Sequence, residues 1–140
     1  MSFYIQNFPY LNFMLYHQHK RRLGRVVLLP EIYGLIRSLG IPATYMGYHF
    51  LASAIALAIE DEDRLLLIIK CLYPEVAKRH NTTLYSVERN LRTVIDVCWK
   101  RGNRQFLDQM AGYTLTSKPS TGEFIDILSS YLKRQNIVNF

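Results

Sequence analysis

The sequence predicts an all-α fold preceded by a short N-terminal extension. Apolar residues recur at helical spacing from Glu31 onwards, and no strand-like alternation of apolar and polar residues persists after residue 31. The length of 140 residues is sufficient for one domain with a core, but short for two. We therefore expect an extension over residues 1–30 and a single domain over residues 31–140.

The extension combines the aromatic segment FYIQNFPYLNFMLY with the basic tract HQHKRRLGR. Pro9 suits the first turn of a helix that reaches about Arg22. RVVLLP indicates a short strand or an extended linker, because Pro30 disfavours helical backbone at Leu29. The aromatic residues either pack on the domain or form a homodimer contact, and the basic tract is either a DNA-binding arm or a solvated tail. The sequence leaves both choices open.

Three helices are predicted in the first part of the domain. EIYGLIRSL carries an apolar stripe, and Gly40 and Pro42 end that helix. Thr44 begins the next helix, over about residues 45–60, and the acidic run EDED forms its junction with the following one. RLLLIIKCLY, residues 64–73, is apolar on nearly every side, so we expect it to be the central helix.

Two helices joined by a tight turn come next. Pro74 opens the short helix PEVAKRH, residues 81–83 form a turn in which Thr83 is the N-cap, and a long helix extends from Leu84 to Arg101. Its apolar side contains Leu84, Val87, Leu91, Val94, Ile95 and Cys98. Its polar side contains Tyr85, Ser86, Arg89, Arg92 and Thr93. After Gly102, RQFLDQM adds one or two helical turns, and EFIDILSSYLKR forms an amphipathic closing helix.

This arrangement is typical of a helix-turn-helix. The major groove of DNA admits one helix, and an arginine side chain can donate two hydrogen bonds to a guanine edge. From Val76 to Arg104, seven Lys or Arg residues stand against two acidic residues. An amphipathic helix with solvated arginines fits the same pattern, so the residues alone leave both interpretations open.

The composition of the sequence indicates which class of partner and which cellular compartment to expect. A net charge of +6 and a pI near 9.4 favour an anionic partner, of which nucleic acid is the usual one. Cys71 and Cys98 lie in apolar runs without a CxxC motif, which predicts reduced, buried thiols. The longest apolar run, FLASAIALAI, is too short to cross a bilayer, and the N-terminus lacks the order of a secretory signal. We expect a cytoplasmic protein with no membrane partner.

The sequence offers no catalytic or metal-binding pattern. His17 and His19 do not align on one helix face, and His49 and His80 are remote from them, so we expect no metal site. No Ser or Cys has a nearby His in sequence, and no phosphate-cradling glycine loop occurs. We therefore expect neither enzymatic activity nor a cofactor.

A resemblance favours the helix-turn-helix interpretation. LYPEVAKRHNTTLYSVERNLRTVIDVCWKRGN, Leu72–Asn103, resembles the DNA-binding effector domain of the stage-zero sporulation response regulator of endospore-forming Firmicutes. GIPATYMGYHFLASAIALAIED resembles the start of that domain and AGYTLTSKPSTGEFIDILSSYLKR its end, so the similarity covers roughly Glu31–Arg134. It implies an all-α domain of about six helices around a helix-turn-helix. It also implies a transcription factor that binds short promoter boxes in double-stranded DNA, often as tandem copies.

The resemblance also implies roles for individual residues. Glu88, Arg89 and Arg92 correspond to recognition-helix residues at the major groove, and Tyr85 lies on the same side. Contacts with the DNA backbone are expected from Lys78, Arg79, Thr82, Thr83 and Lys100. Ser86 stands where the family usually has an arginine, so we expect one base contact to be lost and the preferred box to differ.

The family also has an N-terminal phosphoacceptor receiver domain. The roughly 30 residues before the effector region contain no acidic pocket and no strand–helix alternation, so we expect a stand-alone paralogue rather than an excised piece. The alternative function is that of a degenerate effector domain acting as a protein-interaction module. Its partner would be the full-length regulator or RNA polymerase and its sigma subunit, because residues 104–113 correspond to a polymerase-contacting region.

Overall fold

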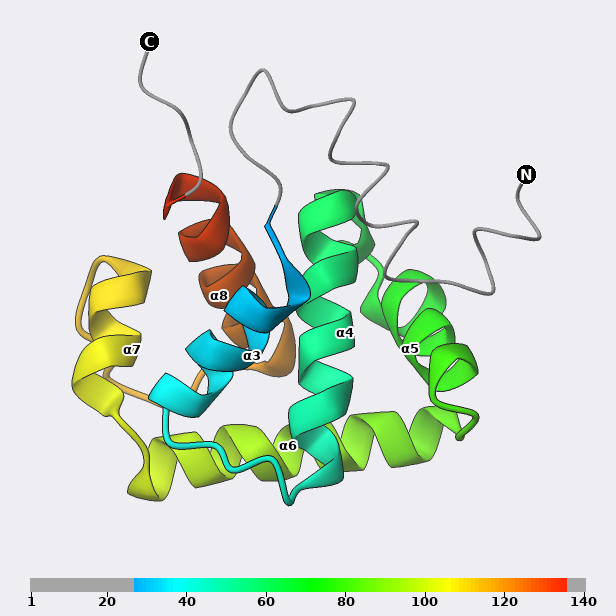
Figure 1. Ribbon diagram of the computed structural model, residues 1–140, viewed down its shortest axis with the longest axis horizontal. Coiled ribbons are helices and arrows are strands. Elements are labelled where there is room, and N and C mark those ends of the chain that lie inside the picture. The colour runs from blue at the N-terminus through cyan, green and yellow to red at the C-terminus, as the bar shows by residue number, and fades with distance from the viewer. Residues whose placement is uncertain (1–26, 136–140) are drawn as a thin grey trace, which may run out of the picture.

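The structure, a computed structural model, describes residues 27–135, and these residues are helical throughout apart from short connections (Figure 1). Six α-helices occur in this range: α3 (Leu29–Ser38), α4 (Met46–Glu60), α5 (Tyr73–Arg79), α6 (Leu84–Arg101), α7 (Arg104–Ala111) and α8 (Thr121–Gln135). A 3-10 helix, η2 (Glu62–Leu65), and a π-helix, η3 (Ile68–Leu72), join α4 to α5. No strand occurs between residues 27 and 135, so the all-α prediction is confirmed. The helix expected from Pro9 lies outside the described residues.

The core is built around α4. Figure 1 shows α4 in the middle of the molecule, with α3 and α8 on one side, α5 on the other, and α6 crossing at its N-terminal end. Nearly every α4 residue from Gly47 to Ile59 is buried, because alanines alternate with larger apolar residues and let neighbouring helices approach closely. The helix begins at Met46 with Tyr45 as its N-cap, one residue later than expected from Thr44.

Residues 64–73 do not form the central helix, and that prediction is wrong. The segment is broken at Leu67 (φ −134°, ψ 66°), and Leu66, Leu67 and Ile69 are 77%, 54% and 65% exposed. After the break, the π-helical turn Ile68–Leu72 leads directly into α5, where Pro74 lies in the first turn, so the chain enters α5 from a wide turn rather than from a continuous α-helix. The even spread of apolar residues therefore reflects an irregular surface segment rather than a helix covered on all sides.

The two thiols also differ from each other. Cys98 is fully buried on the inner side of α6, as predicted, and burial raises the pKa of its thiol to about 11. Cys71 is exposed, so the prediction of a buried thiol is wrong there. Its exposure has the same cause as that of Ile69, because both belong to η3 at the surface.

α3 begins earlier than the sequence predicted. Leu29 is its first residue, so Pro30 does not exclude helical backbone at Leu29. Pro30 lies in the first turn, where a missing N–H costs nothing. The carboxylate of Glu31 accepts a hydrogen bond from the backbone N–H of Leu28 (3.0 Å) and holds the entry to the helix. The apolar stripe predicted for this helix is buried as expected: Ile32, Leu35, Ile36 and Leu39.

Two glycines bring the end of α3 against the end of α6. Gly40, in the left-handed region at φ +86°, follows α3, and a Cβ there would lie 2.9 Å from Gly102 Cα. A Cβ on Gly102 would lie 2.3 Å from the carbonyl oxygen of Leu39, and this same oxygen accepts the N–H of Asn103 at 3.0 Å. Only glycine permits this approach of two backbones.

Candidate nucleic-acid interface

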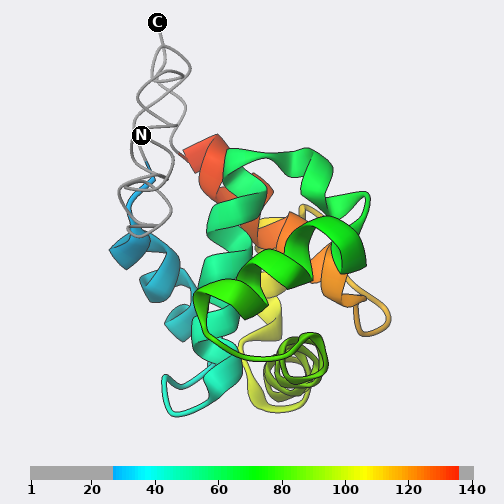
Figure 2. The same cartoon turned by 90° about the vertical axis from the view of Figure 1, so that its right-hand side faces the viewer.

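α6 lies along one edge of the molecule, and Figures 1 and 2 both show its outer side free of other described helices. Its inner side packs on α4, α5 and α8 through buried residues: Val87, Leu91, Val94, Ile95, Val97 and Cys98. Leu84 was expected on this side but is 44% exposed, because the first turn of α6 extends beyond its neighbours. The predicted division of the helix into a buried and an outward side is otherwise correct.

The turn between α5 and α6 forms as the sequence predicted. Asn81 takes a positive φ of 50°, which asparagine tolerates better than most residues, and the N–H of Thr82 donates to the carbonyl of Ala77 at 2.9 Å. The hydroxyl of Thr83 accepts the N–H of Ser86 at 3.1 Å, so Thr83 is the N-cap of α6. These bonds fix the direction in which α6 leaves the turn.

Two contacts from α4 hold the α5–α6 pair in place, and sequence reasoning missed both. His80 in the turn contacts Ser53 through Nε2 and Oγ (2.7 Å) and packs edge-on against Phe50. Burial lowers the pKa of His80, and His49 and Arg79 lower it further. Gly47 forms the second contact, since a Cβ there would lie 2.2 Å from the carbonyl oxygen of Asn90 in α6. The spacing of α4 and α6 is thus set by backbone contact.

The outer side of α6 presents two arginines to solvent. Arg89 is exposed, with its guanidinium 5.7 Å from the ring of Tyr85, which is itself 71% exposed. Arg92 is 70% exposed and lies 3.8 Å from Glu88, one turn earlier. An exposed pair of this kind is weak and is easily exchanged for another partner. Within residues 27–135, neither guanidinium group is covered by another part of the chain, so both are accessible to an anion from solution.

The other predicted contact residues differ in their availability. Lys78 at the end of α5 and Lys100 in the last turn of α6 are exposed, and Thr82 in the turn before α6 is half-buried. Ser86 is half-buried and accepts hydrogen bonds from Asn90 Nδ2 at both its carbonyl (2.7 Å) and its hydroxyl (3.2 Å).

Arg79 is also half-buried. Burial lowers the pKa of its guanidinium, whereas Glu75 and Glu60 beside it raise that pKa, so a phosphate would compete with these carboxylates.

Comparison with known families identifies the domain. The family model described as Sporulation initiation factor Spo0A C terminal matches residues 32–132. The chain belongs to this family. It carries a DNA-binding domain of a transcription regulator of sporulation, and the match includes every α-helix from α4 to α7 together with most of α3 and α8. The helix-turn-helix described above therefore lies within a known DNA-binding family.

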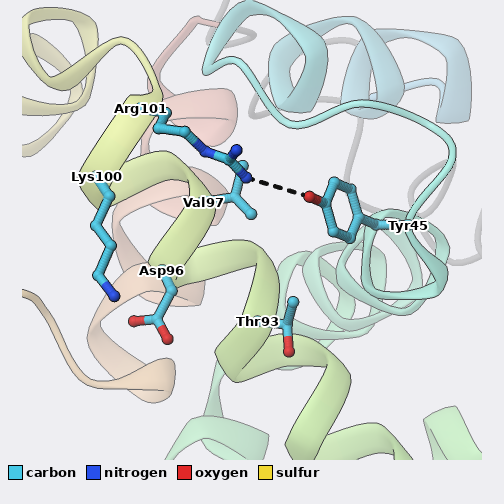
Figure 3. A pocket seen from close by; sticks show the side chains of 6 residues that line it. All are labelled: Tyr45, Thr93, Asp96, Val97, Lys100 and Arg101. Atoms are coloured by element: carbon cyan, nitrogen blue, oxygen red, sulfur yellow. Dashed lines mark hydrogen bonds between the residues drawn. The ribbon is translucent and has the colours of Figure 1, made fainter.

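In this Spo0A C-terminal domain, the structure places two further cationic residues, Arg101 and Lys118, in contacts beside α6. Arg101 donates a hydrogen bond to the hydroxyl of Tyr45 (3.3 Å), and both residues line an open hollow of about 480 Å³ beside α6 (Figure 3). Lys118, from the loop before α8, pairs with Asp96 on α6 and so lies beside the same helix. These contacts join residues far apart in sequence, so no local pattern indicated them.

No group of three or more His, Cys, Asp or Glu residues that could hold a metal ion occurs within residues 27–135. No helix in that range is long and apolar enough to span a membrane.

Proposed function

We propose that the chain is a sequence-specific double-stranded DNA-binding regulator of transcription that acts at the nucleoid in the cytoplasm. The observation that carries this proposal is the solvent-facing position of Arg89 and Arg92 on α6, a helix held by α4 at the edge of a Spo0A C-terminal domain. A helix in this position fits the major groove, and each arginine can donate two hydrogen bonds to a guanine.

The remaining contacts divide by chemistry. Glu88 would accept from a cytosine amino group or orient Arg92, which lies 3.8 Å away. Phosphates would be bound by residues around the two ends of α6: Lys78, Arg79, Thr82, Thr83, Lys100, Arg101 and Lys118. Tyr85 would pack against the sugar–phosphate backbone beside Arg89, and Ser86, engaged with Asn90, would contribute no arginine-like base contact.

The test is a set of binding titrations with duplexes selected from a random library, over a salt series. The parent protein should show a steep salt dependence and a preferred box. Arg89→Ala should lower affinity by about 1–3 kcal/mol and relax the preference at one base pair. Lys78→Ala should weaken all duplexes alike and reduce the salt slope by about one.

Lys70→Ala is the matched control, because Lys70 is an exposed lysine on η3, away from α6. It should leave both box preference and affinity near the parent values. If Arg89→Ala bound the selected box and random duplexes as the parent does, α6 would not be the reading helix. Absence of any binding at low salt would instead favour a protein-interaction module.

We further propose RNA polymerase as a protein partner, through the surface of α7. Gln105 and Gln109 are exposed on α7, and Tyr113 after it is 57% exposed. Tyr113→Ala should then reduce transcription from a box-containing promoter while leaving the affinity for that duplex unchanged. Equal transcription by both proteins would exclude this contact.

A homodimer on tandem boxes would appear in the DNA-binding titrations described above as cooperative binding to two boxes.

A further inference from the structure

The segment after α4 presents an apolar surface that nothing within residues 27–135 covers. Leu66, Leu67 and Ile69, here called the apolar ridge, are each more than half exposed. Their neighbours Leu65 and Ile68 are partly buried against the core, so the ridge is anchored rather than frayed. Large apolar side chains gathered at one surface position mark a contact surface.

Carboxylates border this ridge, although the chain as a whole is basic. Asp61 and Asp63 are exposed at the start of η2, and Asp63 has no ion-pair partner within the described part of the chain. Glu62 between them pairs with Lys133 of α8 at 2.7 Å. The ridge and these two aspartates form a surface suited to an apolar segment that is followed by positive charge.

The chain itself contains such a segment. Residues 3–16, FYIQNFPYLNFMLY, carry no charge, and residues 17–25, HQHKRRLGR, carry Lys20, Arg21, Arg22 and Arg25 without an acidic residue. The segment thus matches the surface in kind, with apolar side chains for the ridge and positive charges for Asp61 and Asp63.

The point at which this segment joins the domain also favours the match. Val27, two positions after the basic tract, is buried at 2% exposure and so fixes where the N-terminal part of the chain joins the core. The first described residues and the C-terminal end of α4 lie at the same end of the molecule in both views, opposite α6 (Figures 1 and 2). The ten residues that link residue 16 to Val27 can extend about 35 Å, which is longer than α4 at about 22 Å, so the ridge lies within reach of residues 3–16.

We propose that residues 3–16 dock on the apolar ridge of the same chain, with the basic tract lying over Asp61 and Asp63. A segment tethered to its own domain has an effective concentration of about millimolar, which favours its own ridge over that of a second copy. Because the ridge lies at the end opposite α6, this docking leaves the outer side of α6 uncovered.

Hydrogen exchange of the full chain, read by mass spectrometry, tests the proposal in both directions. In the parent, amides of residues 3–16 should exchange at least about tenfold slower than in a free peptide of that sequence. Replacing Leu66 and Ile69 together by serine should remove this protection. Replacing Phe8 and Phe13 together by serine should in turn accelerate exchange in residues 62–72. Asp63→Lys should weaken the protection more than Asp63→Asn.

Tyr113→Ser is the matched control, because it removes an exposed aromatic residue elsewhere and should change neither protection. Circular dichroism verifies that each variant keeps its helices, and the Phe8 and Phe13 variant tests the proposal even if the ridge variant unfolds. Free exchange of residues 3–16 in the parent, or protection that survives in the ridge variant, would overturn the proposal. Protection that is lost on dilution, together with a change from dimer to monomer in ultracentrifugation, would assign the ridge to a second copy and overturn docking within one chain.

Discussion

Gly47→Ala should destabilise the domain, although alanine is the better helix former. An added Cβ would lie 2.2 Å from the carbonyl oxygen of Asn90 and 2.7 Å from Val94 Cγ1. Ordinary van der Waals contact begins at 3.4 Å, so α4 and α6 must separate by roughly 1 Å. Overpacking costs about 1–3 kcal/mol of unfolding free energy. Gly47→Ala should fall near the upper end of that range, because the atom that the added Cβ would meet belongs to the rigid backbone of α6. Helix propensity returns up to about 1 kcal/mol, which leaves a net loss of about 2 kcal/mol.

The assay is urea unfolding followed by circular dichroism, with the free energy of unfolding extrapolated to water. Gly34→Ala is the matched control, because Gly34 lies within α3 with nothing within 4 Å of an added Cβ. This control should gain up to about 1 kcal/mol, so the two substitutions should move stability in opposite directions. If Gly47→Ala were as stable as the parent, the close approach of α4 to α6 would not exist, and the orientation of α6 derived from it would be wrong.

Three further predictions concern the turn and the core. Thr83→Ala removes the N-cap of α6 and should cost about 1 kcal/mol of unfolding free energy, whereas Thr116→Ala in the exposed loop before α8 should cost almost nothing; equal urea midpoints would contradict the cap. Burial lowers the pKa of His80, so the imidazole binds a proton more readily in the unfolded chain than in the folded one. The free energy of unfolding should therefore be highest above about pH 6.5 and should fall as the pH drops below that value. His80→Gln should flatten that dependence in urea titrations across pH 5–8, and an unchanged profile would exclude His80 as its source. Leu51→Ala in α4 should cost about 2–5 kcal/mol, but Met46→Ala, at an exposed position of the same helix, less than about 1 kcal/mol; similar losses would show that α4 is not the centre of the core.

Local features of the structure could be predicted from the sequence, because they depend on neighbours along the chain. The Thr83 cap, the turn before it, and the end of α6 at Gly102 each rest on residues within a few positions. The outward position of Arg89 and Arg92 followed from helical spacing alone.

Features that join distant segments could not be predicted in this way. His80 and Ser53 are 27 residues apart, and Lys118 and Asp96 are 22 apart, so no periodicity links them. The misplaced central helix has a related cause. Residues 64–73 and α4 are both apolar on most sides, and only the packing around the alanines of α4 determines which of the two is enclosed.

The crossing of Gly40 and Gly102 has a consequence for the proposed base preference. At that crossing, and at Gly47, α6 is positioned by main-chain atoms rather than by the side chains it shows to solvent. Its tilt is therefore independent of the identity of its outward residues. Under the proposed DNA-binding role, exchanging those residues would change the preferred box while the angle at which α6 meets the DNA stays constant.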